Sequence, residues 1–214
     1  LSPAATGDAD EAGNATPAKV ITTLGDAQPT SVAISPAGRL FLSFFAPVYT
    51  QSDRDDGLAP PLPAIAEHTA EGEIKTLIEP AWPRWDGQRD HTTLRRFVRI
   101  TALRIDRDNR LWALDAGSPR PGQSIVPGGA KVVVIDLDEN AVAAVHYLDE
   151  KHDLPEGADL TDLALDADGR HVYLADAGAE AIHTLDTETG ELHGALAAID
   201  ALSPEPNTTP SGGG

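Results

Sequence analysis

Apolar and polar residues alternate along three segments of the chain, and one tight turn interrupts each alternation. The segments read SVAISPAGRLFLSFF (31–45), TALRIDRDNRLWALDAG (101–117) and TDLALDADGRHVYLADAG (161–178). Alternation on both sides of a turn rich in Pro, Asn, Asp or Gly predicts a β-hairpin whose strands are half-buried. An arginine follows each turn at the same point, so Arg39, Arg110 and Arg170 mark the register of a repeat.

A second hairpin follows each of the first three. These segments read AIAEHTAEGEIKTLI (64–78), KVVVIDLDENAVAAVHYL (131–148) and AIHTLDTETGELHGAL (181–196). Their turns contain Gly72, Asn140 and Gly190, residue types that tolerate the positive φ of short hairpin turns. The sequence therefore predicts a unit of two hairpins, or four strands, that occurs three times.

A repeated four-stranded unit predicts an all-β fold, a β-propeller built from blades. An isolated four-stranded sheet cannot bury both faces, whereas blades stacked around an axis cover one another. A β-sandwich is the alternative, but it does not predict paired hairpins in a repeat. Three units are fewer than the roughly 4–8 blades of a closed propeller, so we expect a partial propeller of about three to four blades that self-associates.

The two ends of the chain differ in composition from the repeats between them. Residues 1–16 are small, polar and acidic, which predicts a disordered leader of the kind that follows a removed export signal. Residues 201–214 are rich in Pro, Thr and Gly and predict a flexible tail. We therefore expect the blades within residues 17–200 and a secreted or periplasmic location.

Charge and residue usage exclude several classes of function. The chain of 214 residues has 34 acidic and 16 basic residues, for a formal net charge of -18, and it has no basic stripe, so we predict no nucleic-acid partner. No apolar run reaches the length of a membrane-spanning helix. The chain has no cysteine, which excludes disulfides, thiolate zinc sites and cysteine nucleophiles.

Five stretches between residues 29 and 190 carry a resemblance to a known family. They read PTSVAISPAGRLFLSF, EPAWPRWDG, LRIDRDNRLWALDAGSPRPG, GGAKVVVIDL and LTDLALDADGRHVYLADAGAEAIHTLD. In this order they resemble the yellow/major royal jelly protein family, especially its bacterial members. The resemblance implies a six-bladed propeller, a secreted protein and a central channel that holds small ligands in some members. Members are longer than this chain, so we expect it to be a partial propeller.

Two carboxylates stand at the same point of successive repeats. Asp115 follows RLWAL and Asp176 follows HVYLA, whereas the first repeat has Phe44 there. Loops that leave the innermost strands of a propeller converge on one mouth of its channel. We therefore expect Asp115 and Asp176, with Trp112 and Arg120, to bind a small polar or cationic ligand, the acids supplying charge and the indole a stacking face. The alternative is that each Asp caps a turn through the backbone.

A second group of candidates lies in PAWPRWDGQRDH (80–91), in the long connection before the second repeat. Trp82 and Trp85 flank Arg84 in a segment with little strand pattern. These side chains are expected either to form a wall of the ligand site or, for the tryptophans, to fill the space between blades.

A metal-assisted hydrolase of the lactonase or esterase type is the competing hypothesis. Related six-bladed enzymes of this type hold a channel metal at the start of their inner strands, and counting back eight positions from the register arginines gives Ser31, Ala102 and Asp162. Only Asp162 is a credible metal ligand, and a hard divalent cation needs several oxygens. We predict no cofactor, and Ca²⁺ at Asp162 would require further ligands. A scaffold that binds protein through the propeller faces is the third hypothesis.

Overall fold

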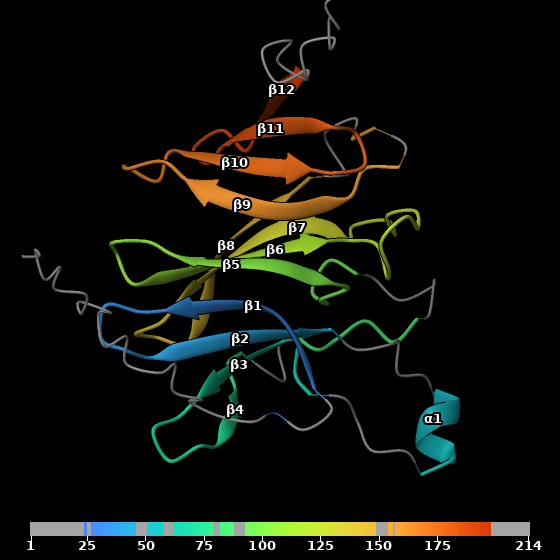
Figure 1. Ribbon diagram of the computed structural model, residues 1–214, viewed down its shortest axis with the longest axis vertical. Helices are drawn as coiled ribbons and strands as arrows, with labels where there is room; N and C mark the ends of the chain where they lie inside the picture. The colour runs from blue at the N-terminus through green and yellow to red at the C-terminus, as the bar shows by residue number, and fades with distance from the viewer. Residues whose placement is uncertain are drawn as a thin grey trace, which may run out of the picture.

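Three four-stranded antiparallel sheets form the described part of the chain and are stacked as blades (Figure 1). The structure is a computed structural model, and it describes residues 24, 27–45, 51–57, 62–78, 82–87, 93–148, 154–155 and 157–197. The predicted all-β, blade-based propeller fold is confirmed, with two hairpins in each sheet. The predicted leader (1–16) and tail (201–214) lie outside the described residues.

Each blade uses four strands in their order along the chain. The first blade contains β1 (Gln28–Ile34), β2 (Leu40–Phe45), β3 (Ile65–His68) and β4 (Ile74–Thr76). The second contains β5 (Ile100–Ile105), β6 (Arg110–Ala116), β7 (Ala130–Asp136) and β8 (Ala141–Tyr147). The third contains β9 (Leu160–Leu165), β10 (His171–Asp176), β11 (Ala181–Asp186) and β12 (Leu192–Ala197). One helix is described, α1 (Gln51–Asp55), and no described helix is long and apolar enough to cross a membrane.

The first strand of each blade is its inner strand. β1 packs beside β5 and β5 packs beside β9, and Figure 1 shows these three strands one above another with β8 behind them. The strands that carry Trp112, Asp115 and Asp176, β6 and β10, are second in their sheets. The side chains nearest the propeller axis therefore come from β1, β5 and β9.

Two apolar clusters hold the blades together. Between the first and second blades, Phe41 of β2 packs with Leu103 and Leu111 of the second blade, and all three are fully buried. Between the second and third blades, Trp112 of β6 packs with Leu174 of β10. Successive side chains of a strand point to opposite faces of its sheet. The apolar residues of the middle blade therefore form one apolar layer against the first blade and another against the third.

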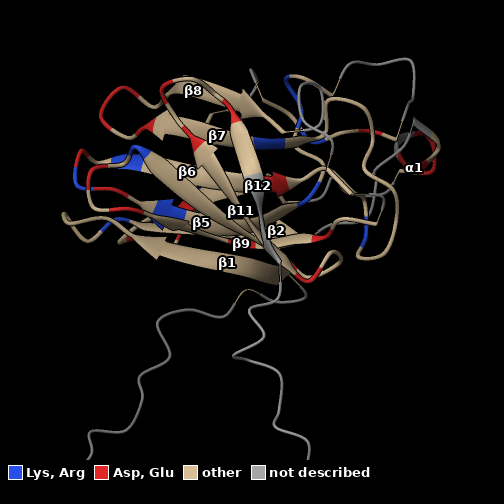
Figure 2. Ribbon diagram, turned by 90° about the horizontal axis from the view of Figure 1, so that it is seen from above, with Lys and Arg blue, Asp and Glu red and all other residues tan. Residues whose placement is uncertain are grey.

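The hairpin turns lie at one end of the blades, where the ribbon carries both acidic and basic residues (Figure 2). The predicted positive φ angles are present at Gly72 (85°), Asn140 (51°) and Gly190 (72°). Each register arginine reaches a carboxylate at this end, in the ion pairs Arg39–Glu67, Arg110–Asp106 and Arg170–Asp186. Arg39 also donates to the Leu137 carbonyl at 2.7 Å, which fastens the first blade to the second.

Candidate functional site

Each inner strand begins with a β-bulge, and a threonine occupies all three bulges. The pairing between inner and second strand shifts by one residue around Thr30, Thr101 and Thr161. Each of these threonines stands nine positions before a register arginine. Bulges are common beside functional sites because the extra residue aims its side chain away from the regular pleat. The bulges lie at the end of the blades opposite the hairpin turns.

The three hydroxyls differ in how firmly the protein holds them. Thr30 Oγ1 donates to the Ile100 carbonyl at 2.9 Å and so links the first two blades. Thr101 Oγ1 lies 3.5 Å from the Leu114 carbonyl, and Thr161 Oγ1 lies 3.4 Å from the Ala175 carbonyl. Bonds of this length are at the weak limit of a hydroxyl hydrogen bond. The hydroxyls of Thr101 and Thr161 are therefore free to exchange these partners for a polar ligand.

An exposed ion pair lies further along the same strands. Arg104 Nη2 of β5 is 2.6 Å from Asp162 Oδ1 of β9, and the two side chains are 40% and 55% exposed. The carboxylate that the sequence offered as a metal ligand is thus paired with a guanidinium. Among the described residues, no group of three or more His, Cys, Asp and Glu side chains is placed to hold a metal ion.

The Asp115 carboxylate lies inside the second blade, where it is fully buried. Its oxygens accept the backbone N–H groups of Val98 (2.8 Å), Arg99 (2.9 Å) and Gly117 (3.0 Å). The Lys131 ammonium, which is also fully buried, lies 3.1 Å from Asp115 Oδ2. Asp115 therefore fastens the chain that leads into β5 to the chain that leaves β6, which is the arrangement expected of a capping Asp.

Asp176 makes the same connection in the third blade and is 2% exposed. It accepts the backbone N–H groups of Asp159 (2.8 Å), Gly178 (3.0 Å) and Ala179 (3.1 Å), and His183 Nε2 lies 2.9 Å from its other oxygen. Burial alone would raise the pKa of Asp176, but these hydrogen bonds outweigh it and hold the pKa below its ordinary value.

Asp176 is expected to make stability sensitive to acid. A carboxyl whose pKa is lower in the folded state stabilises the fold above its unfolded pKa of about 4, and this contribution is lost as the pH falls through the folded value. We expect the difference in unfolding free energy between the wild type and Asp176→Asn to shrink between about pH 5 and pH 3. Denaturant titrations across this range measure it, and a difference that does not change with pH would contradict the expectation.

The remaining candidates are dispersed. Trp82 and Trp85 are 6% and 9% exposed, and Trp82 belongs to the cluster between the first two blades, as expected if tryptophan fills that space. Arg84 donates to three carbonyls of the first blade, those of Phe44, Leu62 and Pro63. Arg120 is exposed in the connection from β6 to β7.

The structure does not gather the seven candidate ligand residues into one site. Trp112 donates from Nε1 to Asp106 at 2.8 Å and packs toward the third blade. Asp115 stands three positions after Trp112 in the same strand, so its side chain lies on the opposite face of the sheet. The sequence contained a signal for the bulge threonines that the prediction did not use. Counting back nine rather than eight positions from each register arginine gives Thr in all three repeats.

Comparison with known proteins gives one family match. The model of the family described as "Major royal jelly protein" matches residues 99–210, just over half of the chain. No curated protein matches.

Two solved structures show limited similarity to the fold. Hydrazine synthase of Kuenenia stuttgartiensis is 16% identical, with a TM-score of 0.46 over 85% of this chain and 38% of its own. The extracellular domain of a protein described as a hybrid two-component system from B. thetaiotaomicron is 9% identical, with a TM-score of 0.43 over 77% of this chain and 16% of its own. The chain therefore spans well under half the length of either protein.

Proposed function

The chain belongs to the major royal jelly protein family, and we propose that it binds a small polar ligand at the mouth formed by its inner strands. The ligand would contact the bulge threonines Thr30, Thr101 and Thr161, beside the Arg104–Asp162 ion pair. The observation that carries the proposal is the hydroxyl placed at the same bulge in every blade. All three threonines are exposed or half-buried, and the Thr101 and Thr161 hydroxyls have only long hydrogen bonds to carbonyls of their own blades.

The chemistry of these groups favours a polyhydroxylated ligand. A threonine hydroxyl both donates and accepts, as does each hydroxyl of a sugar or polyol. The ion pair adds one donor group and one acceptor group, and an exposed pair contributes little to stability, so exchanging it for a ligand costs little. Asp162 and the net charge of -18 also make a small cation acceptable, which keeps amines as the second ligand class to test.

The export of the protein was predicted from the sequence of residues 1–16, which lie outside the described residues. It stays a prediction.

Ligand binding is tested by calorimetry against monosaccharides, polyols and small amines. We expect at least one polyhydroxylated compound to bind and the Thr101→Val/Thr161→Val variant to bind it about tenfold more weakly, because each lost hydrogen bond is worth about 0.5–1.5 kcal/mol. The control is Thr187→Val, whose hydroxyl bonds the Gly169 and Arg170 carbonyls at the turn end. The proposal fails if no compound of the panel binds, or if the double variant binds as tightly as the control.

A further inference from the structure

A cavity of about 410 Å³ opens between the outer parts of the first two blades. One apolar wall comes from Val142, Val145 and Tyr147 of β8, the outermost strand of the second blade, which lies at an edge of the molecule (Figure 2). The other wall comes from Ile78 and Trp82, in the chain that follows β4. The volume lies within the roughly 300–1,000 Å³ of small-molecule sites. The bulge threonines are on the inner strands, so this cavity is a separate site.

The apolar core between the two blades fixes both walls of the cavity. Ile78 and Trp82 belong to the cluster that joins the first blade to the second, and Val142 and Val145 pack against that cluster. The Trp82 ring also contacts the Phe97 ring, with 5.4 Å between the two centroids. A ligand would therefore meet walls that are already ordered, which lowers the entropic cost of binding.

Arg95 brings a positive charge to this cavity. Its side chain is exposed, and its guanidinium makes no ion pair or hydrogen bond within the described part of the chain. The arginines of other cavities differ in this respect. Arg39 lines a second cavity and is paired with Glu67, and Arg110 lines a third and is paired with Asp106. No acidic residue is among the described residues that line the Arg95 cavity, although the chain has 34 of them.

The backbone that carries Arg95 is held against the wall of the cavity. Tyr147 Oη donates to the Leu94 carbonyl at 2.8 Å. The Arg96 N–H donates to the Thr93 carbonyl at 3.0 Å and closes a turn around Leu94 and Arg95. Because Tyr147 also lines the cavity, its hydrogen bond ties the position of Arg95 to the apolar wall beside it.

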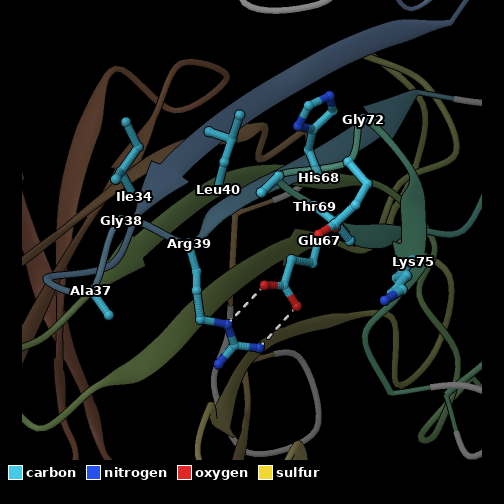
Figure 3. Close-up of a pocket in the computed structure, with 12 residues that line it drawn as sticks. Ile34, Ala37, Gly38, Arg39, Leu40, Glu67, His68, Thr69, Gly72 and Lys75 are labelled. Atoms are coloured by element: carbon cyan, nitrogen blue, oxygen red, sulfur yellow. Dashed lines mark hydrogen bonds and ion pairs between the residues drawn. The ribbon is translucent and has the colours of Figure 1, made fainter.

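Asn140 offers a second donor group from the turn before β8. Its amide oxygen accepts a hydrogen bond from Arg39 Nη2 at 3.3 Å, and Glu67 holds Arg39 in a bidentate pair (Figure 3). The amide nitrogen of Asn140 has no hydrogen-bond partner among the described residues. The cavity therefore combines apolar walls with two donor groups that oxygen atoms of a ligand can satisfy.

We propose that this cavity binds a small organic carboxylate with an apolar body. The carboxylate pairs with Arg95, whose planar guanidinium can donate two parallel hydrogen bonds to it. The apolar body lies between Trp82 and the valines of β8, where it is removed from water. A chain with a net charge of -18 repels small anions at long range, so binding depends on the local charge of Arg95.

Calorimetric titration of the 214-residue chain with phenylacetate, indole-3-acetate and hexanoate tests the proposal. We expect at least one of these acids to bind and Arg95→Gln to weaken its binding about tenfold or more, because charge-assisted hydrogen bonds are lost. The neutral amide of the same acid should bind the wild type about tenfold more weakly than the acid does. The control is Arg107→Gln, which makes the same change in net charge at an exposed arginine of the turn between β5 and β6.

The proposal is overturned if none of the three acids binds to the wild type. It is also overturned if Arg95→Gln and Arg107→Gln bind an acid equally well, because the effect would then come from net charge alone, or if an acid and its amide bind equally well. Melting temperatures check that both variants keep the fold, as expected for exposed side chains. The two proposed sites share no residue, so failure of this inference leaves the polyol site of the inner strands to be judged by its own titration.

Discussion

Replacing Asp115 with asparagine should lower the free energy of unfolding by about 3–5 kcal/mol, the usual cost of leaving a buried charge without its partner. The Lys131 ammonium is fully buried and its donors point to Asp115 and to the carbonyls of Gly128 and Gly129. Asparagine keeps the size of the side chain but removes the negative charge. It also turns an N–H₂ group toward backbone donors or the ammonium.

The Asp115 prediction has a matched control and a rescue. Asp162→Asn makes the same change in the exposed Arg104–Asp162 pair and should cost less than about 1 kcal/mol. Adding Lys131→Met to Asp115→Asn removes the unpaired ammonium, so the double variant should be more stable than Asp115→Asn alone. Denaturant unfolding monitored by tryptophan fluorescence measures all three. Equal losses for Asp115→Asn and Asp162→Asn would show that burial of the pair has no energetic consequence.

Gly117→Ala should destabilise the fold by about 3 kcal/mol or more, since overpacking and an unfavourable φ add together. Gly117 has a φ of 71°, and a Cβ placed there would lie 2.2 Å from the backbone nitrogen of Ala130. A backbone atom cannot swing aside as a side chain can, so β6 and the start of β7 would have to separate. That separation would also strain the hydrogen bond from the Gly117 N–H to Asp115.

The comparison for Gly117 is a glycine with the same φ and open surroundings. Gly190 has a φ of 72°, and a Cβ added there would meet no atom within 4 Å, so Gly190→Ala should cost only the conformational term of about 1–2 kcal/mol. Thermal and denaturant unfolding of both variants measure the difference. If the two alanine variants were equally stable, close backbone approach at Gly117 would not be the reason for glycine there.

The third blade has the same arrangement as Asp115 and Gly117, an aspartate two positions before a closely packed glycine, at Asp176 and Gly178. A Cβ on Gly178 would lie 2.0 Å from the Gly157 carbonyl oxygen, and the Gly178 N–H bonds Asp176. The aspartate needs N–H donors close by, and the glycine lets the neighbouring backbone approach closely enough to supply them. This pairing accounts for the Asp-Ala-Gly that is repeated where the second strand ends in the second and third blades.

Local patterns were sufficient for the strands and the turns. The period-two alternation around Arg39, Arg110 and Arg170 predicted the first hairpins correctly, because side chains of a strand alternate between its faces wherever the strand lies. Gly72, Asn140 and Gly190 were recognised as turn residues because the positive φ of a short hairpin restricts residue type without any help from the rest of the fold.

The candidate site was predicted less well, because its residues depend on distant partners. Asp115 and Asp176 were identified as equivalent positions, but Lys131 and His183 come from the next strand and the backbone donors from the chain before the inner strand. Arg104 and Asp162 form an ion pair between two blades. The residues around either one in the sequence do not indicate that the other is its partner. The threonines were visible in the repeat, yet their significance depends on the bulges.

The sequence by itself determined the unit of two hairpins, its three occurrences and the family, since these are properties of residues near one another in the chain. The tertiary structure alone decided which strand of each unit is inner and which equivalent side chain is covered. Val32 and Leu103 follow the same pattern, yet one is 57% exposed and the other is fully buried. The reason is that burial of these side chains depends on the contact between blades. The sequence of one segment does not indicate whether another blade packs against it.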